Sequence, residues 1–296
     1  MFTQLPPEII HQVVESVNLL QRARIMMTCR YFHQVLEPTL YRHLSLLDPE
    51  LYSRSGRLHQ TLCDRPALIS QVVTYHGPVC PSKDPGRSGN FFWDRTIFDE
   101  PRWSVGLTFF QKAVNIRDLY FTDHFNQWIG DPTFAHHKEA VKHMVLDRLV
   151  IQVPDESGGV VQVLRHQSEL TRLELPWGGG VWNDLETTDI PKLKSLTATL
   201  ETAAFIVPGR PVDEVNLLPS QGARWLNEDL LQKLSESTRP IRKFEMKLYN
   251  PLDDDSVRDA LQALARHLPA IEDLTITVGG RISGRIVSRL ALPCDK

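Results

Sequence analysis

Leu170-Thr171-Arg172-Leu173-Glu174-Leu175 is one copy of a six-residue phrase, apolar-x-x-apolar-x-apolar, that recurs after the first hundred residues. In its seven clear copies, every strand-core position is apolar. The central apolar residues are separated by 30, 24, 23, 19, 29 and 30 residues. They are Leu119, Leu149, Leu173, Leu196, Val215, Phe244 and Leu274. Alternation with a period of two residues predicts, for each copy, a short strand with one buried face.

Amphipathic helices are predicted between these strands. The clearest stripe follows a capping stretch, Asp-Asp-Asp-Ser at residues 253–256, and proline stands at three of the helix-to-strand joints. The apolar stripes are Val257, Leu261, Leu264 and Leu268; Leu226, Leu230, Leu231 and Leu234; and Val160, Val163 and Leu164. One strand and one helix in every 19–30 residues predict a repeat array.

In period and phrase, the array resembles the leucine-rich-repeat family. The resemblance implies an α/β fold in which βα units stack into a solenoid, or horseshoe. The Asn or Cys that usually follows the last strand residue is mostly absent, so the repeats are degenerate. A weaker, eighth copy is predicted at residues 69–74. The variable spacing leaves a second interpretation open, an α/β sandwich built from βα units.

The first 46 residues contain three short helical patterns that are too apolar to form an adequate core alone. Pro6 and Pro7 suit the first turn of a helix, and Glu8 stands near the positive end of its dipole. Pro38 is expected to stop or kink the third helix. This segment predicts a docking module, with a helical cap on the following domain as the alternative.

Residues 5–46 resemble the F-box family, especially its fungal form. The matching parts are Leu5-Pro6-x-Glu8-Ile9, Cys29-Arg30-x-Phe32 and the closing stretch Leu-Tyr-Arg-His-Leu-Ser-Leu at residues 40–46. The spacer before the second helix is shorter than usual, and Met26-Met27 and Phe32 replace Leu-Val and Trp, which are common there. The resemblance implies binding to the Skp-family adaptor of a cullin–RING ubiquitin ligase and, through it, to the cullin. By position, the adaptor-facing residues are Leu5, Pro6, Ile9, Ile10, Val13, Leu20 and Phe32.

We therefore expect an F-box at residues 1–46, a connecting segment with a Pro/Gly-rich loop at residues 47–105, and a repeat domain at residues 106–296. The aromatic residues of the connecting loop favour packing onto the first repeats over gripping a substrate. At the other end, Ile282, Ile286 and Leu290 predict a last helix. That helix either caps the array or marks an array cut short relative to its relatives.

Composition excludes several classes of function. The 296 residues are 42% hydrophobic and 23% charged, which is ordinary for a soluble globular protein. A net charge of −3 argues against nucleic-acid binding. No apolar run reaches the ~18 residues of a membrane span, and the start does not resemble a signal peptide. The four cysteines are scattered, which favours reduced thiols and a cytoplasmic or nuclear location.

Motifs for catalysis or metal binding are weak. Gly178-Gly179-Gly180 lacks the lysine of a phosphate loop, and no Gly-x-Ser-x-Gly nucleophile motif occurs. No cysteine or well-spaced acid joins His136, His137 and His143, and Asp253-Asp254-Asp255 lacks the calcium-loop pattern. We therefore expect a non-catalytic protein without a metal site or cofactor.

The predicted array instead offers a binding surface. In a solenoid, strand residues that point away from the core line one face, and Tyr and Arg dominate protein-interface hot spots. The candidate substrate-binding residues are Tyr120, Arg148, Arg172, Glu174 and Lys243. The sequence thus predicts the substrate-recognition subunit of an SCF-type, cullin–RING ubiquitin ligase, with a protein target. The alternative is a repeat-based interaction scaffold that acts outside a ligase.

Overall fold

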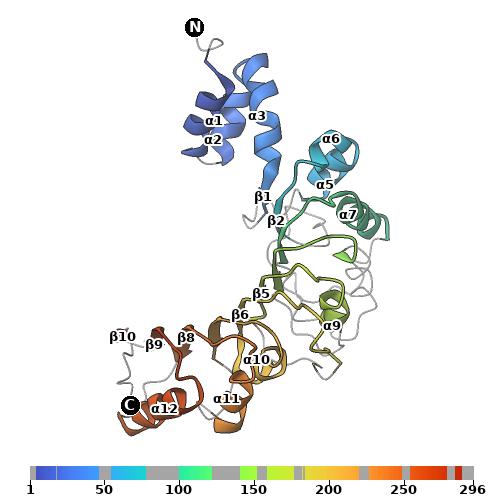
Figure 1. Ribbon diagram of the computed structural model, residues 1–296. Helices are drawn as coiled ribbons and strands as arrows, with labels where there is room; N and C mark the ends of the chain where they lie inside the picture. Colours follow the sequence, from blue (N-terminus) through green and yellow to red (C-terminus); the bar gives the residue numbers. More distant parts are fainter. Residues whose placement is uncertain are drawn as a thin grey trace, which may run out of the picture. The chain divides into compact units, whose positions relative to one another are not determined.

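The computed structural model describes residues 5–17, 19–46, 55–77, 100–121, 141–151, 159–176, 182, 184–219, 227–248, 254–278 and 284–288. The chain divides into two compact units. Unit 1 comprises Met1–Asp123 and Glu139–Met144, and unit 2 comprises His124–Lys138 and Val145–Lys296. Within each unit, the strands lie side by side in the order of the chain (Figure 1).

Unit 1 begins with three helices and continues with alternating strands and helices. The helices are α1 (Pro7–Glu15), α2 (Leu19–Met26) and α3 (Arg30–Arg42). They are followed by β1 (His43–Ser45), α5 (Ser55–Cys63), α6 (Pro66–Ile69), β2 (Thr74–Gly77), α7 (Glu100–Lys112) and β3 (Asp118–Phe121). The three strands are parallel. Unit 1 therefore combines the N-terminal helical segment, much of the connecting segment and the first predicted repeat.

Helix α3 contains Pro38 and continues to Arg42, so the helix does not stop at this proline. A proline inside a helix costs about 3 kcal/mol, since one backbone hydrogen bond is lost. Leu36 is 1% exposed, and Leu40 packs against the same core. This packing on both sides of the proline offsets the cost and holds the helix together.

Strand β2 corrects the predicted position of the eighth repeat copy. Buried Tyr75 pairs with Leu119, so the copy occupies residues 72–77 and not residues 69–74. The phrase is hard to recognise because its last apolar position is Gly77. A Cβ atom there would lie 2.9 Å from the Tyr75 Oη atom and 3.1 Å from another side chain, so only glycine fits.

Strand β1 adds a further copy that the sequence did not reveal. Leu44 pairs with Tyr75, and Leu44 and Leu46 are buried. The stretch at residues 40–46 thus carries the end of α3 directly into the first strand, without an intervening loop. The helical segment and the first strands are covalently and structurally continuous.

The described part of unit 2 contains six parallel strands, connecting helices and one antiparallel strand. Its first half consists of β4 (Arg148–Ile151), α9 (Gly159–Leu164), β5 (Arg172–Glu174), β6 (Ser195–Thr199) and α10 (Leu200–Ile206). Its second half consists of β7 (Glu214–Leu218), α11 (Glu228–Leu234), β8 (Lys243–Leu248), α12 (Asp254–His267), β9 (Asp273–Val278) and β10 (Gly284–Ser288). The four helices lie along one side of the strands (Figure 1).

The seven predicted strands all form, from β3 to β9, and their central residues are at most 1% exposed. In unit 2 these residues also stand in register: Leu149, Leu173, Leu196, Val215, Phe244 and Leu274. A mixed α/β fold with a parallel sheet is therefore confirmed. Helices α5, α6, α7 and α10 were not predicted. Helix α10 begins where the Thr199 Oγ1 atom accepts a hydrogen bond from the Thr202 N–H at 3.4 Å.

The last helix predicted from Ile282, Ile286 and Leu290 is wrong. Ile286 lies in strand β10, which pairs antiparallel with β9, and Ile286 stands opposite Ile276. A β-branched pair, Ile-Val at residues 286–287, suits a strand, and its pairing covers the hydrogen-bonding groups at the edge of β9. Ile282 and Leu290 lie outside the described residues, as do the Gly-rich stretch at residues 178–180 and residues 78–99 of the Pro/Gly-rich loop expected at residues 76–104. The ends of that loop instead form part of β2 and α7.

Candidate protein-interaction surfaces

Helix α1 buries one apolar face between the first helices. Ile10 and Val14 are each 3% exposed and form a small core with Met26 of α2 and Leu36 of α3. Partly buried apolar side chains from α2, α3 and the turn after α1 pack around this core. The spacing of Ile10 and Val14, four residues apart, places them on one side of the helix.

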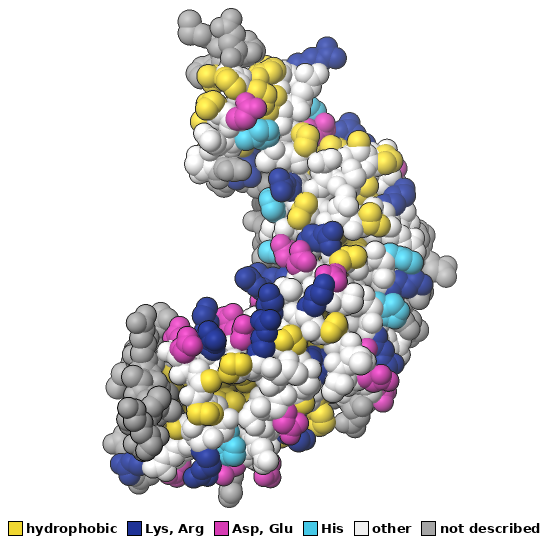
Figure 2. Space-filling view, viewed as in Figure 1, with side chains coloured by type: hydrophobic (Ala, Val, Ile, Leu, Met, Phe, Trp, Pro, Cys, Tyr) yellow, Lys and Arg dark blue, Asp and Glu magenta, His cyan; other side chains and the backbone are white. Residues whose placement is uncertain are grey.

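A second apolar face of the same segment is exposed. Leu5, Ile9 and Val13 are also spaced by four residues, and they are 37%, 43% and 58% exposed. We call these three residues the α1 strip. Four of the seven exposed large hydrophobic side chains that the structure describes lie in the first 27 residues, the α1 strip and Met27. Figure 2 shows this concentration of hydrophobic surface on the N-terminal helices. Such a concentration is typical of a protein-interaction site.

Hydrogen bonds between distant residues hold the α1 strip in position. The Tyr31 hydroxyl of α3 donates to the Leu5 carbonyl at 2.7 Å. The Thr39 hydroxyl and the His11 Nδ1 atom lie 3.0 Å apart and join α3 to the middle of α1. Helix α3 is itself capped by Cys29, whose Sγ atom accepts from the Phe32 N–H at 3.5 Å.

The structure separates the residues predicted to face an adaptor into two groups. The exposed ones are Leu5, Pro6, Ile9 and Val13. Ile10 is buried in the core between the helices, and half-buried Phe32 packs against that core. Leu20 lies in α2, and its side chain is outside the described part of the chain. In this arrangement Ile10 and Phe32 hold the helices together, and the α1 strip and Pro6 remain exposed.

Comparison with known families identifies this segment. Residues 2–47 match the F-box-like family model, which covers the three helices and β1. The match supports an F-box protein. F-box-like domains generally bind Skp-family adaptors. No curated protein matches the chain.

Beyond the F-box, the strands of unit 2 present an outward row of charged and polar residues. Side chains at alternate strand positions point away from the buried central residues. Pairing between neighbouring strands brings together, in order, Arg148, Arg172, Ser195, Glu214, Lys243 and Asp273. All are exposed or half-buried. No helix of the described residues lies over this row, and we call it the uncovered strand face of unit 2.

The predicted substrate-binding residues do not form one cluster. Tyr120 lies in β3 of unit 1, where its ring lies 5.3 Å from that of His76. In unit 2, the Arg148 Nε atom donates to the Glu174 Oε1 atom at 3.1 Å, and a second guanidinium nitrogen contacts the same oxygen. Arg172 is exposed next to Arg148. Lys243 lies three strands away from Arg172, in β8.

The described residues contain no group of three or more His, Cys, Asp or Glu side chains that could hold a metal ion. None of the helices that the structure describes is long and apolar enough to cross a membrane. His143 is exposed, whereas His136 and His137 lie outside the described residues. The polar clusters that do occur in unit 2 are structural.

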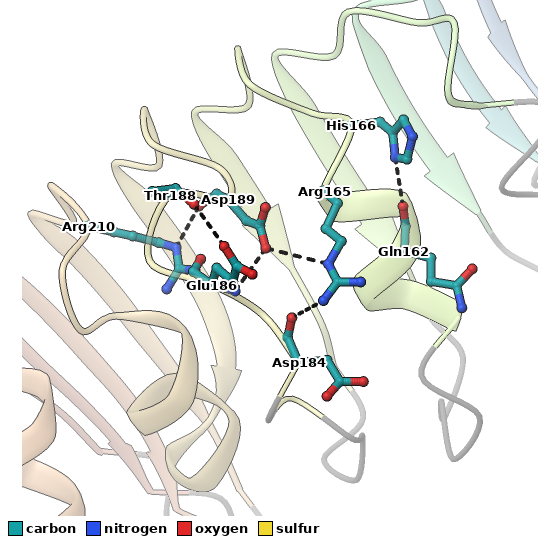
Figure 3. Close-up of polar contacts among 8 residues, drawn as sticks. All are labelled: Gln162, Arg165, His166, Asp184, Glu186, Thr188, Asp189 and Arg210. Carbon is teal, nitrogen blue, oxygen red and sulfur yellow. Dashed lines mark hydrogen bonds and ion pairs between the residues drawn. The ribbon is translucent and has the colours of Figure 1, made fainter.

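One such cluster surrounds Arg210, which is only 1% exposed (Figure 3). Its guanidinium donates to the carbonyls of Glu186, Asp189, Ile206 and Pro208, with the bond from Nε to Asp189 at 2.9 Å. Burial lowers the pKa of Arg210 below its ordinary value, and the Asp189 carboxylate opposes that shift. These bonds fix a turn to the end of helix α10.

Arg210 holds this turn at a strained point. Ile190, which follows Asp189, has a φ of 48°, in the left-handed region that β-branched residues rarely adopt. Arg165 braces the same turn, because it donates to the Asp184 carbonyl and lies 3.8 Å from the Asp189 carboxylate (Figure 3). Sequence reasoning missed Arg210, since an arginine between Gly209 and a proline is typical of an exposed loop.

A second buried polar residue, His59, lies in unit 1 among aromatic rings. It is 0% exposed and stacks on Phe109 with ring centroids 4.5 Å apart. Its Nε2 atom lies 2.9 Å from the Tyr75 hydroxyl, and its Nδ1 atom has no hydrogen-bond partner among the described residues. Burial lowers the pKa of His59 to about 3. The imidazole is therefore a neutral part of the core.

Proposed function

We propose that this protein is the substrate-recognition subunit of a cullin–RING ubiquitin ligase. The F-box binds a Skp-family adaptor, and through it the cullin. The strand region, a degenerate leucine-rich-repeat solenoid, binds a protein target. The observation that carries the proposal is the F-box-like match at residues 2–47 together with the exposed α1 strip within it.

The α1 strip has the properties of an adaptor-docking surface. Its apolar side chains are exposed, although the same helix has a separate set of apolar side chains that fill the core. Burying a partly exposed apolar side chain contributes about 25 cal/mol for each Å² removed from water. A partner that covers the α1 strip therefore gains free energy without disturbing the core of the F-box.

The strand region has features that suit a solenoid with a target-binding face. In each unit, strands follow one another in chain order, and the order does not reverse as in a doubly wound sheet. In unit 2, the described helices lie along one side of the strands, and no described helix lies over the other face (Figure 1). Repeat proteins use such extended uncovered faces to bind partners.

The role assigned here is non-catalytic and is carried out in the cytoplasm or nucleus. The ligase would supply the ubiquitin-carrying enzyme, and this protein would hold the target beside it. Holding two reactants together raises their effective concentration and so accelerates transfer. The residues that perform this work are docking residues on two separate surfaces.

Co-purification tests the proposal. The full chain, tagged and co-expressed with a Skp-family adaptor and a cullin, is expected to retain both. A triple variant, Leu5→Ala, Pro6→Ala and Ile9→Ala, is expected to lose both while its thermal melting curve stays cooperative. Loss of both partners follows because the cullin is reached through the adaptor.

A matched control replaces exposed apolar residues outside the F-box, Val114→Ala with Val145→Ala, which are 50% and 43% exposed. This variant is expected to retain adaptor and cullin. If the unmodified chain fails to retain the adaptor at micromolar concentrations, the ligase assignment is wrong, and a scaffold that acts outside a ligase becomes the better account.

A further inference from the structure

We propose that the β5–β6 part of the uncovered strand face binds a segment of the target protein rich in Asp and Glu. Arg172 and Lys194 are the residues that make the contact. This inference rests on the proposed function, because it assigns the chemistry of the target to the same strand face. It narrows the candidate target-binding residues of the strand face to those of β5 and β6.

The first observation is a pair of like charges in direct register. Arg148 of β4 stands opposite Arg172 of β5. Like charges on facing positions of neighbouring strands destabilise a sheet. On its other side, Arg172 faces Ser195 of β6, which carries no charge. Repulsion between the two guanidinium groups therefore destabilises the sheet at β4 and β5, and a bound anion would relieve this repulsion.

The second observation is that the nearby acid is already engaged. Glu174 lies two residues from Arg172 on the same strand, yet its carboxylate pairs with Arg148 across the strands. Among the described residues, no side chain forms an ion pair or hydrogen bond with the Arg172 guanidinium. Arg172 is exposed and presents a planar fork of N–H donors, which suits a carboxylate.

A third cation stands beside the pair. Lys194 immediately precedes Ser195, and its backbone N–H bonds to the carbonyl of Thr171, the residue before Arg172, at 2.9 Å. Its side chain is exposed and forms no ion pair within the described part of the chain, although Asp213, whose backbone N–H donates to the Lys194 carbonyl at 3.0 Å, is its neighbour on the other side. We call Arg148, Arg172 and Lys194 the basic cluster. Figure 2 shows dark blue side chains gathered where Figure 1 shows β5 and β6.

The excess of positive charge is confined to the basic cluster, as a comparison with Lys243 shows. It lies on the same face, but its strand neighbours in register are Glu214 and Asp273, one on each side. Its positive charge is therefore balanced by the row itself. The whole chain has a net charge of −3, so the surplus at the basic cluster does not reflect composition.

The geometry favours a peptide segment over a single small anion. The two cations are exposed, and exposed ion pairs are individually weak because water and salt screen them. Several carboxylates on one segment reach Arg172 and Lys194 together and so bind more tightly than one. The half-buried hydroxyls of Ser195 and Thr197 lie beside them and suit hydrogen bonding to a peptide backbone.

Fluorescence anisotropy with synthetic peptides tests this assignment. The probe is a fluorescein-labelled peptide that alternates Glu and Gly, and the reference probe replaces every Glu with Gln. The full chain is expected to bind the Glu peptide more tightly, with an affinity that falls as salt is added. Arg172→Gln and Lys194→Gln are each expected to weaken binding about fivefold, the loss that corresponds to the upper end for one exposed ion pair.

Lys243→Gln is the matched control, since it removes the same charge from an exposed site on the same face. It is expected to leave affinity for the Glu peptide within about twofold. Arg172→Gln is expected to leave the melting temperature unchanged or slightly higher, because it relieves repulsion from Arg148. A residue with a purely structural role would lower the melting temperature instead.

Three outcomes would overturn the assignment: equal binding of the Glu and Gln peptides, equal losses from Arg172→Gln and Lys243→Gln, or binding of a phosphoserine peptide by a chain that does not bind the Glu peptide. Adaptor binding by the same variants separates this proposal from the ligase assignment. Arg172→Gln is expected to retain the adaptor fully, so a failure of the peptide experiment leaves the F-box test unaffected.

Discussion

At the scale of single residues, the protein buries polar groups that its strands and helices do not require. His59 is the clearest case, because its imidazole is fully buried and one ring nitrogen has no partner among the described residues. Arg210 is the opposite case, since four carbonyls surround its buried guanidinium. The two residues lead to different predictions, one for pH dependence and one for stability at neutral pH.

His59 makes stability depend on acidity. Its pKa is about 3 in the folded protein and 6.5 in its ordinary state. As pH falls below about 6.5, His59 binds a proton in the unfolded chain but not in the folded chain, so the free energy of unfolding falls. The loss is up to ~1.4 kcal/mol for each pH unit, and it stops near pH 3. Above about pH 6.5, His59 contributes no dependence on pH.

Urea unfolding of the full chain at several pH values checks this prediction. The comparison variant is His59→Phe, which keeps a ring beside Phe109 and removes the titrating group. As pH falls, the unfolding free energy of the unmodified chain is expected to decrease more than that of the His59→Phe variant. Parallel pH profiles for the two proteins would contradict the prediction.

Arg210→Met is expected to lower the free energy of unfolding by about 3–5 kcal/mol, because buried carbonyls lose their donors and the Ile190 turn loses its support. Arg165→Met serves as the control, since Arg165 braces the same turn from an exposed position. Its cost is expected to be ~1 kcal/mol or less. Equal losses in chemical denaturation would show that burial of Arg210 is not what matters.

At the scale of elements, helix α1 shows how one short helix serves a core and a surface. Ile9 and Ile10 are neighbours of the same type, yet Ile9 is 43% exposed and Ile10 is 3% exposed. Sequence alone predicted an apolar helix and placed both residues at the adaptor interface. Which of the two faces is buried depends on how α2 and α3 pack, and that information is tertiary.

A pair of alanine substitutions separates the two faces. Ile10→Ala is expected to lower the melting temperature, since truncating a buried isoleucine costs about 2–5 kcal/mol. Ile9→Ala is expected to change stability by less than ~0.5 kcal/mol, because the side chain is already exposed. Differential scanning calorimetry of the two variants measures both effects. A larger loss for Ile9→Ala would reverse the assignment of the faces.

The strands show where sequence patterns are strong and where they fail. Seven strands were predictable, because apolar residues alternate in each and every central residue is buried. The position predicted for strand β2 was shifted along the sequence, because Gly77 stands where an apolar residue is expected. A larger side chain at this position would collide with Tyr75. Strand β10 was mistaken for a helix, because Ile286 fits a helical spacing and its pairing with Ile276 is a long-range contact.

At the scale of the whole molecule, the sequence indicated a docking segment and a surface but not the division between them. The F-box helices continue into β1 within unit 1, so the helical segment and the first strands share one compact unit. The substrate-binding candidates were chosen by residue type. The structure distributes them over two units and shows that Glu174 pairs with Arg148, whereas Arg172 has no ion pair among the described residues.

Titration calorimetry with a purified Skp-family adaptor measures whether the α1 strip is the docking surface. We expect that the full chain binds, that Val13→Asp loses at least about tenfold in affinity because a charge enters an apolar interface, and that Val114→Asp binds normally. Val13 and Val114 are 58% and 50% exposed, so the two changes are matched. Absence of binding by the full chain, or full-strength binding by Val13→Asp, would contradict this expectation.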